Sequence, residues 1–173
     1  QNLDKFYITA PRGEIYDLKG EKVASTSLVP HLYINLRKIT NDNLTDYKQI
    51  IQYNFPKLLS SEINEIFNSK DILSLVIDLS NVEYEVRNNL LKNYDAFEIF
   101  DLPIRKYIQN ELFAHTVGYL GKPNNEETSE FKNALGNNQV GKNGLERYYE
   151  EFLSGVPGEV VFEGSEIVDY KQP

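Results

Sequence analysis

Apolar residues near the two ends of the chain are spaced as in β-strands. Residues 5–10 and 15–18 form short apolar runs, and Pro11-Arg12-Gly13 between them is a turn signal. A hairpin-like turn is expected at 18–21, because Gly20 adopts positive φ without a steric penalty. Further strands are expected over 23–36 with Pro30 as an interruption, over 72–77, over 97–104, and in a terminal hairpin of 160–163 and 167–170 around Gly164-Ser165.

Helical spacing replaces this pattern in the middle of the chain. The apolar residues of 44–51 recur on one helix face, and Pro56 ends that run. Ser60 or Ser61 is expected to cap a second helix, whose apolar stripe is Ile63, Ile66 and Phe67. The sequence therefore predicts two consecutive helices before the buried strand at 72–77.

Two more helices are predicted from capping patterns. Residues 80–83 fit a capping box that opens a third helix, with Val82, Val86 and Leu90 as its buried stripe. Asn143-x-x-Glu146 opens a last helix, which Gly155 ends. The apolar side of this last helix is expected to be Leu145, Tyr148, Tyr149, Phe152 and Leu153. The polar, Asn-rich segment 122–138 is interpreted as an exposed loop, with one helical turn around 131–135.

Composition and charge narrow the functional classes. The chain has 173 residues and a net charge of −8, with neither Cys nor Met. Excess negative charge disfavours nucleic-acid backbones and anionic bilayers, so a protein or an uncharged glycan is the more compatible partner. The absence of Met indicates a processed or excised chain, and no apolar run is long enough to span a bilayer. A membrane anchor upstream of Gln1 is expected to have been cut away.

Three ordered motifs resemble signatures of one family. Residues 10–24 (APRGEIYDLKGEKVA) resemble APRGxIxDRNGxxLA, with Leu18-Lys19 in place of Arg-Asn and Val23 in place of Leu. Residues 105–121 (RKYIQNELFAHTVGYLG) resemble RxYPxGxxxxHxxGYxG, with Ile108 and Asn110 in place of Pro and Gly. Residues 141–155 (GKNGLERYYEEFLSG) resemble GKxGLExxYExxLxG without a departure. Together they are similar to the N-terminal pedestal, or dimerisation domain, of class B penicillin-binding proteins, and within these to the elongation-type penicillin-binding protein 2 branch.

The resemblance implies a fold and a domain organisation. The expected fold class is α+β, an elongated pedestal of β segments with an inserted small α/β head lobe. The expected boundaries are 1–37 for the first part of the pedestal base, 38–95 for the head lobe and 96–173 for the second part of the base. The transmembrane anchor and the transpeptidase domain of such a protein are expected to be absent from this chain.

The resemblance also implies a function. The parent enzyme would be a serine D,D-transpeptidase that binds penicillin and cross-links peptidoglycan during cell elongation and shape maintenance, anchored at the extracytoplasmic (periplasmic) face of the cell membrane. The pedestal would position the catalytic domain and dock on a SEDS glycosyltransferase of the RodA type, with MreC as a second candidate partner. The motif residues expected to act in structure or partner coupling are Arg12, Gly13, Asp17, Gly20, Arg105, Tyr107, His115, Gly118, Tyr119, Gly141, Gly144 and Glu146.

These motif residues also have an interpretation from charge alone. Arg12 and Asp17 flank a turn, so their charges can clamp it. Glu146 lies in the first turn of a helix, where the helix dipole favours a carboxylate. It can accept a bidentate hydrogen bond from Arg12 or from Arg105. We expect architectural ion pairs rather than ligand contacts, because buried charges usually have partners.

Catalytic residues are not expected within the chain. Ser129-Glu130-Phe131-Lys132 matches SxxK, but it lies in a polar segment and no SxN, KTG or KSG triplet accompanies it. His31 and His115 lie in no metal-ligand cluster, and His115 is expected to pack behind the helix of the second motif. Neither a cofactor nor a metal is expected.

Two alternatives to the pedestal remain open. Glu126-Glu127 and Glu150-Glu151 are most simply solvated, but two carboxylates in one cleft would suit a secreted glycan hydrolase. A generic cell-surface scaffold module is the other alternative. Labelling by a fluorescent penicillin and turnover in a glycan-release assay separate these possibilities.

Overall fold

The computed structural model describes residues 3–108 and 111–173, which belong to two compact units. Unit 1 comprises Val29–Asp101 with Gln1–Phe6 and Phe162–Val168, and unit 2 comprises Tyr7–Leu28, Leu102–Val161 and Asp169–Pro173. Each unit is thus assembled from three separate segments of the chain. The boundaries expected from the sequence, at 37/38 and 95/96, stay a prediction. Among the described residues, no helix is both long and apolar enough to cross a membrane.

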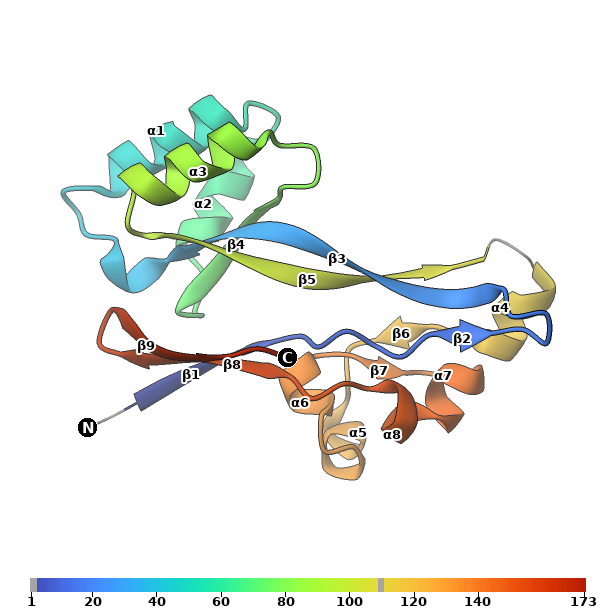
Figure 1. Ribbon diagram of the computed structural model, residues 1–173. Coiled ribbons are helices and arrows are strands. Elements are labelled where there is room, and N and C mark those ends of the chain that lie inside the picture. Colours follow the sequence, from blue (N-terminus) through green and yellow to red (C-terminus); the bar gives the residue numbers. More distant parts are fainter. Residues whose placement is uncertain (1–2, 109–110) are drawn as a thin grey trace. The chain divides into compact units, whose positions relative to one another are not determined.

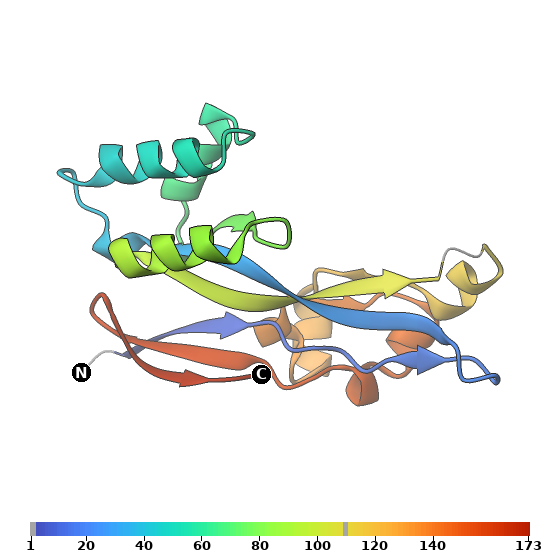
Figure 2. The ribbon, with the colours of Figure 1, turned by 45° about the horizontal axis from the view of Figure 1, so that its top comes forward.

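Unit 1 contains a β-sheet with helices on one face (Figures 1 and 2). Strand β4 (Leu73–Asp78) pairs antiparallel with the second half of β3 (Lys22–Asn35), from His31 opposite Asp78 to Asn35 opposite Leu73. Strand β5 (Phe97–Tyr107) also pairs with β3. The covering helices are α1 (Leu44–Asn54), α2 (Ser60–Phe67) and α3 (Tyr84–Asn93), and a 3-10 turn, η1 (Leu36–Lys38), follows β3.

The core of unit 1 lies between this sheet and its helices. Its buried members are Leu32, Ile34, Tyr47, Ile51, Phe55, Ile63, Ile66, Val76, Leu79, Leu90, Ala96 and Phe97. The helix faces predicted from apolar spacing are therefore confirmed for α1 and α2, and Leu90 is the buried residue of α3. Burial of such side chains is the main favourable term in folding.

A second, three-stranded sheet has the order β1 (Leu3–Ile8), β8 (Gly158–Glu163), β9 (Glu166–Lys171). Strands β8 and β9 are the predicted terminal hairpin, and Gly164 in its turn has a φ of 62°. In the part of this sheet that belongs to unit 1, the Phe6 ring contacts the Tyr33 ring edge-on, with centroids 5.9 Å apart. Tyr33 in turn contacts Phe100 at 5.7 Å. Burial raises the pKa of Tyr33 to about 12.

Unit 2 consists of short elements. Strand β2 (Ile15–Tyr16) pairs antiparallel with the start of β3, where Ile15 lies opposite Ala24. A two-stranded ribbon joins β6 (Leu120–Gly121) to β7 (Val140–Gly141). The helices are α4 (Glu111–Val117), α5 (Asn125–Glu130), α6 (Ala134–Asn137), α7 (Gly144–Tyr148) and α8 (Glu150–Leu153).

Strand β3 is continuous through Pro30, so the predicted interruption is wrong. Proline lacks an N–H donor but keeps its carbonyl, and the Pro30 carbonyl accepts a hydrogen bond from Leu79 N at 2.8 Å. Strand β3 pairs with β2 near Ala24 and with β4 from His31 onward, and Pro30 lies between these two paired stretches.

The predicted helix caps differ from those observed. Ser60 is the first residue of α2, and the Glu62 carboxylate accepts the exposed N–H of Leu59 at 2.7 Å. Helix α3 begins at Tyr84, so no capping box forms at 80–83. Instead, the Arg87 guanidinium donates to the carbonyls of Leu79 and Val82 at 2.6 and 2.8 Å. A side chain from inside the helix thereby satisfies the segment that was expected to cap it.

The segment 122–138 is not an exposed loop. It forms α5 and α6, and Phe131 and Ala134 pack against Val140 as a small core of unit 2. Asn124 caps α5: its side-chain oxygen accepts from Glu127 N, and Glu127 accepts from Asn124 N, both at 2.8 Å. The segment was predicted as a loop because most of its residues are polar, and its short helices make few apolar contacts.

Candidate functional site

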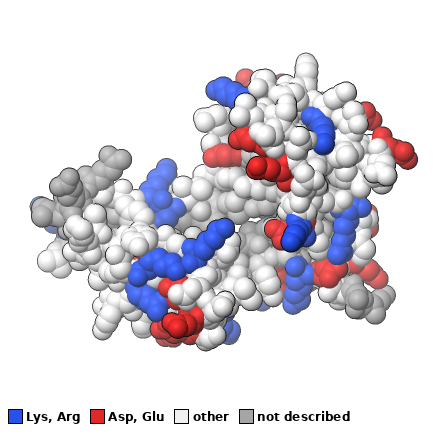
Figure 3. All heavy atoms as spheres, turned by 180° about the vertical axis from the view of Figure 1, so that it is seen from behind, with Lys and Arg blue, Asp and Glu red and all other residues white. Residues whose placement is uncertain are grey.

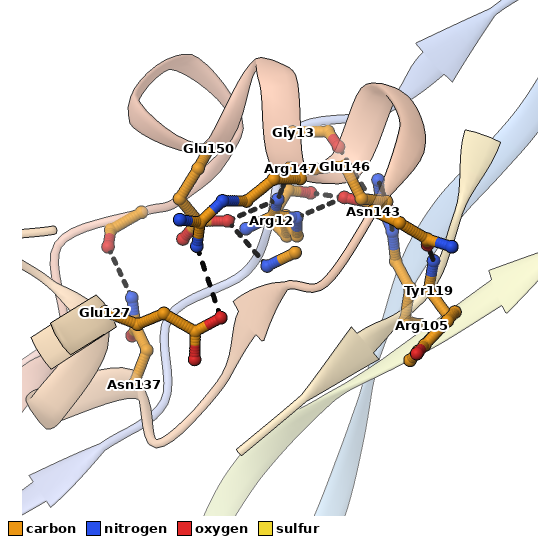
Figure 4. A network of polar contacts seen from close by, with 12 residues as sticks. Arg12, Gly13, Arg105, Tyr119, Glu127, Asn137, Asn143, Glu146, Arg147 and Glu150 are labelled. Atoms are coloured by element: carbon orange, nitrogen blue, oxygen red, sulfur yellow. Dashed lines mark hydrogen bonds and ion pairs between the residues drawn. The ribbon is translucent and has the colours of Figure 1, made fainter. Parts of the chain in front are cut away.

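A buried cluster of charges lies within unit 2 (Figure 4). Arg12, from the segment between β1 and β2, donates through Nε to Glu146 Oε2 at 2.5 Å and through Nη2 to the Glu146 carbonyl at 2.8 Å. The same Nη2 lies 2.7 Å from Glu150 Oε2. These three side chains are 3%, 0% and 1% exposed. The pairing of Glu146 with Arg12, which the sequence offered as one option, is present.

The second arginine of the cluster comes from β5. Arg105 Nε donates to Glu146 Oε1 at 2.8 Å, and Arg105 Nη1 donates to the Gly13 carbonyl at 2.7 Å. The Tyr107 hydroxyl donates to the same Glu146 oxygen at 3.1 Å. Burial, with the neighbouring Glu146 charge, raises the pKa of Tyr107 to about 12. Both arginines therefore bind Glu146, where the sequence left a choice between them.

The chemistry of this cluster is that of a structural joint. Arg12, Arg105, Glu146 and Glu150 carry two positive and two negative charges, so the buried charge is balanced. Glu146 accepts hydrogen bonds from three side chains and is fully buried, so a substrate cannot reach it in this arrangement. Glu150 is occupied on one oxygen, which accepts from Gly141 N at 2.8 Å and contacts Arg12. Such a network gains little net energy over an apolar core but is costly to break by removing one partner.

Three glycines of the second and third motifs make the cluster geometrically possible. A Cβ on Gly141 would lie 2.1 Å from the Glu146 carbonyl oxygen, so β7 approaches α7 only because that residue lacks a side chain. Gly118 has a φ of 83°, and a Cβ there would lie 2.0 Å from the Asn143 carbonyl oxygen. Gly144, at a φ of 60°, lies directly against Thr116 in the same contact. The motif glycines thus allow backbone-to-backbone packing of the segments that carry Glu146.

The remaining predicted residues lie outside the cluster or at its edge. Asp17 does not pair with Arg12; its carboxylate accepts from Lys19 N and Glu21 N at 2.8 and 2.9 Å and closes the turn that contains Gly20. His115 is exposed on α4, so the expected packing behind that helix is wrong. Tyr119 is 56% exposed and contributes its backbone, whose N–H donates to Asn143 Oδ1 at 3.3 Å. Asn110, the expected departure from the second motif, lies outside the described residues.

The last helix differs from its prediction in several ways. It breaks at Tyr149 into α7 and α8, and Asn143 makes no side-chain cap, because its Oδ1 is used by Tyr119. The buried face carries Glu146 and Glu150, while Tyr148 and Phe152 are 80% and 86% exposed. The predicted apolar stripe is therefore wrong for Tyr148, Tyr149 and Phe152, whereas Leu145 and Leu153 are half-buried. The glutamates face inward because two buried arginines, Arg12 and Arg105, pair with them there.

Gly155 follows the helix but is not a left-handed stop, because its φ is not positive. Its role is close approach: a Cβ there would lie 2.6 Å from the Pro11 carbonyl oxygen. Close by, the Gly13 N–H donates a hydrogen bond to the Leu153 carbonyl at 2.8 Å. The first and third motifs therefore run against each other through backbone contacts.

Asn137 is a polar residue that sequence reasoning missed. It is 4% exposed; its Oδ1 accepts from Ala10 N and its Nδ2 donates to the Gly155 carbonyl, both at 2.8 Å. Thr9 donates its hydroxyl to the Asn137 carbonyl at 3.0 Å. Asn137 thus joins the first motif to the end of the third. The only available signal was an Asn next to Asn138, which has a φ of 51° and ends α6.

A second ion-pair group lies beside the cluster. Glu127, 8% exposed, is bound by Lys142 Nζ at 2.5 Å and by Arg147 Nη1 at 3.2 Å, and Arg147 also reaches Glu130 at 2.6 Å. The hydrogen bond from Lys142 lowers the pKa of Glu127. Arg147 lies over the Phe131 ring, 4.6 Å from its centroid. The expectation that Glu127 and Glu150 are solvated is therefore wrong.

Glu127 and Glu150, the buried members of the two carboxylate pairs, differ in setting from the carboxyl groups of a glycosidase. A glycosidase needs two carboxyl groups in one cleft, whereas Glu127 and Glu150 are each held by cations and buried. Ser129, the candidate serine, is exposed on α5 and donates its hydroxyl to the Asn125 carbonyl at 3.1 Å. Lys132 lies beyond the end of that helix and is also exposed. Elsewhere, basic and acidic side chains lie close together in several places on the face in Figure 3.

Comparison with known proteins identifies the family. The family described as the penicillin-binding protein dimerisation domain matches residues 7–166. The chain belongs to this family. It is 29% identical over 162 residues to the peptidoglycan D,D-transpeptidase MrdA of Haemophilus influenzae, a match that covers 85% of this chain and 24% of the relative. The MrdA of Acinetobacter baumannii is 28% identical over 157 residues, covering 85% and 23%. The chain therefore spans about a quarter of the length of the curated relatives it matches.

Solved structures share the fold of this dimerisation domain. A complex between penicillin-binding protein 2 and MreC from Helicobacter pylori aligns with a TM-score of 0.72 and 20% identity over 99% of this chain and 34% of that one. Penicillin-binding protein 2 from the same organism aligns with a TM-score of 0.64. The expected α+β pedestal fold is confirmed, as is the expectation that the chain is the non-catalytic dimerisation domain of the family.

Proposed function

We propose that the chain serves as the pedestal of a peptidoglycan D,D-transpeptidase used in cell-wall elongation and cell-shape maintenance. The observation that carries the proposal is the match to the dimerisation-domain family over residues 7–166. The curated relatives in which such a segment makes up about a quarter of the chain are named as peptidoglycan D,D-transpeptidases. The pedestal would hold the catalytic domain in place and supply no reacting group of its own.

The buried cluster supports a mechanical role. Arg12, Arg105, Glu146 and Glu150 come from three distant parts of the sequence, and their contacts lie within unit 2. Removing any one of them takes at least one partner away from another buried charge. A unit built in this way resists gradual deformation, which suits a spacer that must transmit position to an attached domain.

Docking of other wall-synthesis proteins belongs to the same proposal. One structural neighbour is a complex of penicillin-binding protein 2 with MreC. We extend this to the present chain as a candidate partner, beside a SEDS glycosyltransferase of the RodA type. The place of action would be the extracytoplasmic face of the cell membrane, with the anchor and the catalytic domain supplied by other parts of the full-length protein. In that setting the pedestal would couple the polymerase to the cross-linking enzyme.

Penicillin labelling tests the catalytic half of the proposal. The isolated chain and a longer protein that contains it are incubated with a fluorescent penicillin and separated by electrophoresis. The longer protein is expected to carry the label, and the isolated chain is not. Covalent labelling of the isolated chain, or turnover of peptidoglycan by it in a glycan-release assay, would overturn the pedestal proposal in favour of an enzyme.

Co-purification tests the docking half. The longer protein is expected to retain a RodA-type protein in detergent, and Glu146→Ala is expected to weaken this retention. Thermal melting of the variant separates loss of docking from loss of folding. Arg37→Ala, which removes a half-exposed contact with Asp4, is the matched control and should leave retention unchanged. Unchanged retention in a Glu146→Ala variant would remove the coupling role of the cluster and leave only a stabilising one.

A further inference from the structure

An apolar groove on unit 2 is filled by none of the residues that the structure describes. It has a volume of about 370 Å³ and lies between β2 and the helices α7 and α8. Its apolar lining includes Ile15, Leu145, Tyr149, Phe152 and Leu153, and Glu14 is the acidic residue of its lining. Phe152 is 86% exposed and Tyr149 45% exposed, so two large rings stand at the groove without cover. Exposed apolar surface of this kind marks interaction sites.

The rings beside the groove form a connected array. The Tyr148 and Tyr149 rings contact edge-on with centroids 4.8 Å apart, and Tyr149 contacts Phe152 at 6.3 Å. These contacts hold the aromatic faces in place before any partner arrives, which lowers the entropic cost of binding. Aromatic faces attract guanidinium groups as well as apolar side chains.

Glu14 gives the groove a charge. Its carboxylate accepts from the Tyr16 hydroxyl and lies 3.0 Å from Lys22 Nζ. The Tyr16 hydrogen bond, with that of Lys22, lowers the pKa of Glu14, so the group is ionised at neutral pH. Lys22 is 54% exposed, so this surface pair is weak and easily exchanged. Each carboxylate oxygen also has a second lone pair, which leaves room for a two-pronged donor.

We propose that this groove binds a segment of a different protein, one that inserts an apolar side chain and places an adjacent arginine on Glu14. The guanidinium fits because it can donate to both carboxylate oxygens and lie against the aromatic array. This inference deepens the proposed docking function and rests on it only in assuming a protein partner. The groove and its chemistry come from the structure alone.

A second copy of this chain is disfavoured as the source of the arginine. Arg12 and Arg105 are held in the buried cluster, and Arg87 is held by the carbonyls of Leu79 and Val82. To reach Glu14 of another copy, Arg37 would have to leave Asp4, and Arg147 would have to leave Glu127 and Glu130. The net charge of −8 also disfavours contact between two copies. Charge complementarity therefore favours a heterologous partner.

A pair of blocked peptides tests the inference. The probe is Ac-Gly-Leu-Leu-Arg-Gly-NH₂, and its control carries citrulline, the neutral isostere, in place of arginine. Titration into the isotopically labelled chain, followed by NMR, should shift the amide signals of Ile15, Leu145 and Phe152. The citrulline peptide should bind about fivefold more weakly, the size of one exposed charge pair.

Variants locate the binding. Phe152→Ala removes an exposed ring and should abolish the shifts without unfolding the chain, while Glu14→Gln should bring arginine and citrulline peptides to equal affinity. Tyr53→Ala, which removes an equally exposed ring from unit 1, is the control and should change nothing. Equal binding of both peptides to the unaltered chain, or shifts away from the groove, would overturn the proposal. So would self-association of the chain that Phe152→Ala abolishes, since a second copy would then be the occupant.

The test of the groove can fail or succeed independently of the test of docking on a RodA-type protein. Peptide binding at the groove with no loss of RodA-type retention in a Phe152→Ala full-length protein would support the groove but assign it another protein partner. Retention that persists while the peptides fail to bind would overturn the groove and leave the docking proposal standing.

Discussion

Arg12 and Glu146 lie 134 positions apart in the sequence, yet their side chains meet at 2.5 Å with 3% and 0% of their surface exposed. The contact brings the first and third motifs together. Glu150 and Arg105 complete the charge balance around them. The motifs therefore meet in one buried cluster of charges, the joint of unit 2, although they lie far apart in the sequence.

Replacing Arg12 by methionine should strongly destabilise the chain. Methionine keeps much of the volume but leaves Glu146 and Glu150 without Arg12, and losing one partner of a buried pair costs about 3–5 kcal/mol. Urea unfolding measures the change in the free energy of unfolding. Arg37→Met is the control, since its contact with Asp4 is exposed and should cost about 1 kcal/mol or less. Equal, small effects of the two substitutions would contradict the joint.

Gly118 and Gly20 separate backbone strain from close packing. Their φ angles are 83° and 82°, but a Cβ on Gly118 would lie 2.0 Å from the Asn143 carbonyl, whereas Gly20 has open space. Gly20→Ala should cost about 1–2 kcal/mol from the left-handed conformation alone. Gly118→Ala should cost that amount and about 1–3 kcal/mol more from overpacking. Thermal unfolding of both variants measures the difference, and similar midpoints would argue against the close contact.

Asn137→Ala should destabilise the chain through unpaired backbone groups. It leaves Ala10 N and the Gly155 carbonyl buried without their side-chain partner, at about 1–3 kcal/mol for each group. Asn93→Ala is the matched control, because Asn93 Nδ2 makes only an exposed bond to the Asn89 carbonyl. Chemical denaturation compares the two. A loss no larger than that of Asn93→Ala would show that water replaces the Asn137 side chain.

The raised pKa of Tyr107 predicts that the free energy of unfolding falls at alkaline pH. Its folded pKa of about 12 lies above the usual value of about 10, so the folded state retains the proton longer than the unfolded state. This contribution is fully present below pH ~10 and is lost as the pH rises towards ~12. Tyr107→Phe should therefore show a shallower decline across this range than the unaltered chain.

Unfolding experiments across that pH range measure the slope. Tyr33 keeps a raised pKa of about 12 from burial, so the decline should become shallower in Tyr107→Phe but not vanish. Tyr53→Phe, at an 86% exposed position, serves as the control and should follow the unaltered chain. A Tyr107→Phe variant with the original slope would show that the Tyr107 hydroxyl is not shielded from solvent.

Local patterns identified most elements of unit 1. The apolar spacing at 44–51 and around Ile63 predicted α1 and α2, and the run at 72–77 predicted β4. The hairpin at Gly164 followed from turn chemistry. These features can be predicted because each depends on residues within a few positions of one another. An apolar core is also stabilised by side chains that recur on one face of an element, so their spacing indicates the element.

The buried cluster of charges in unit 2 could not be predicted from local patterns in the same way. Glu150 and Glu127 were expected in solvent, and the aromatic residues around Phe152 were expected in the core. A carboxylate becomes a buried residue only when a cation reaches it, and the cations here come from segments far away in the sequence. The apolar residues displaced to the surface then create the groove.

The sequence alone determined the family motifs, the α+β class, the turns that need glycine, and the absence of cysteine chemistry. Tertiary structure decided that Arg12 and Arg105 share one carboxylate, that Asn137 joins two motifs, and that the last helix turns its glutamates inward. The physical reason is that periodicity reports the preference of a side chain for water or for an apolar interior. Burial of charge depends on a partner, and only the folded chain determines which partner lies within reach.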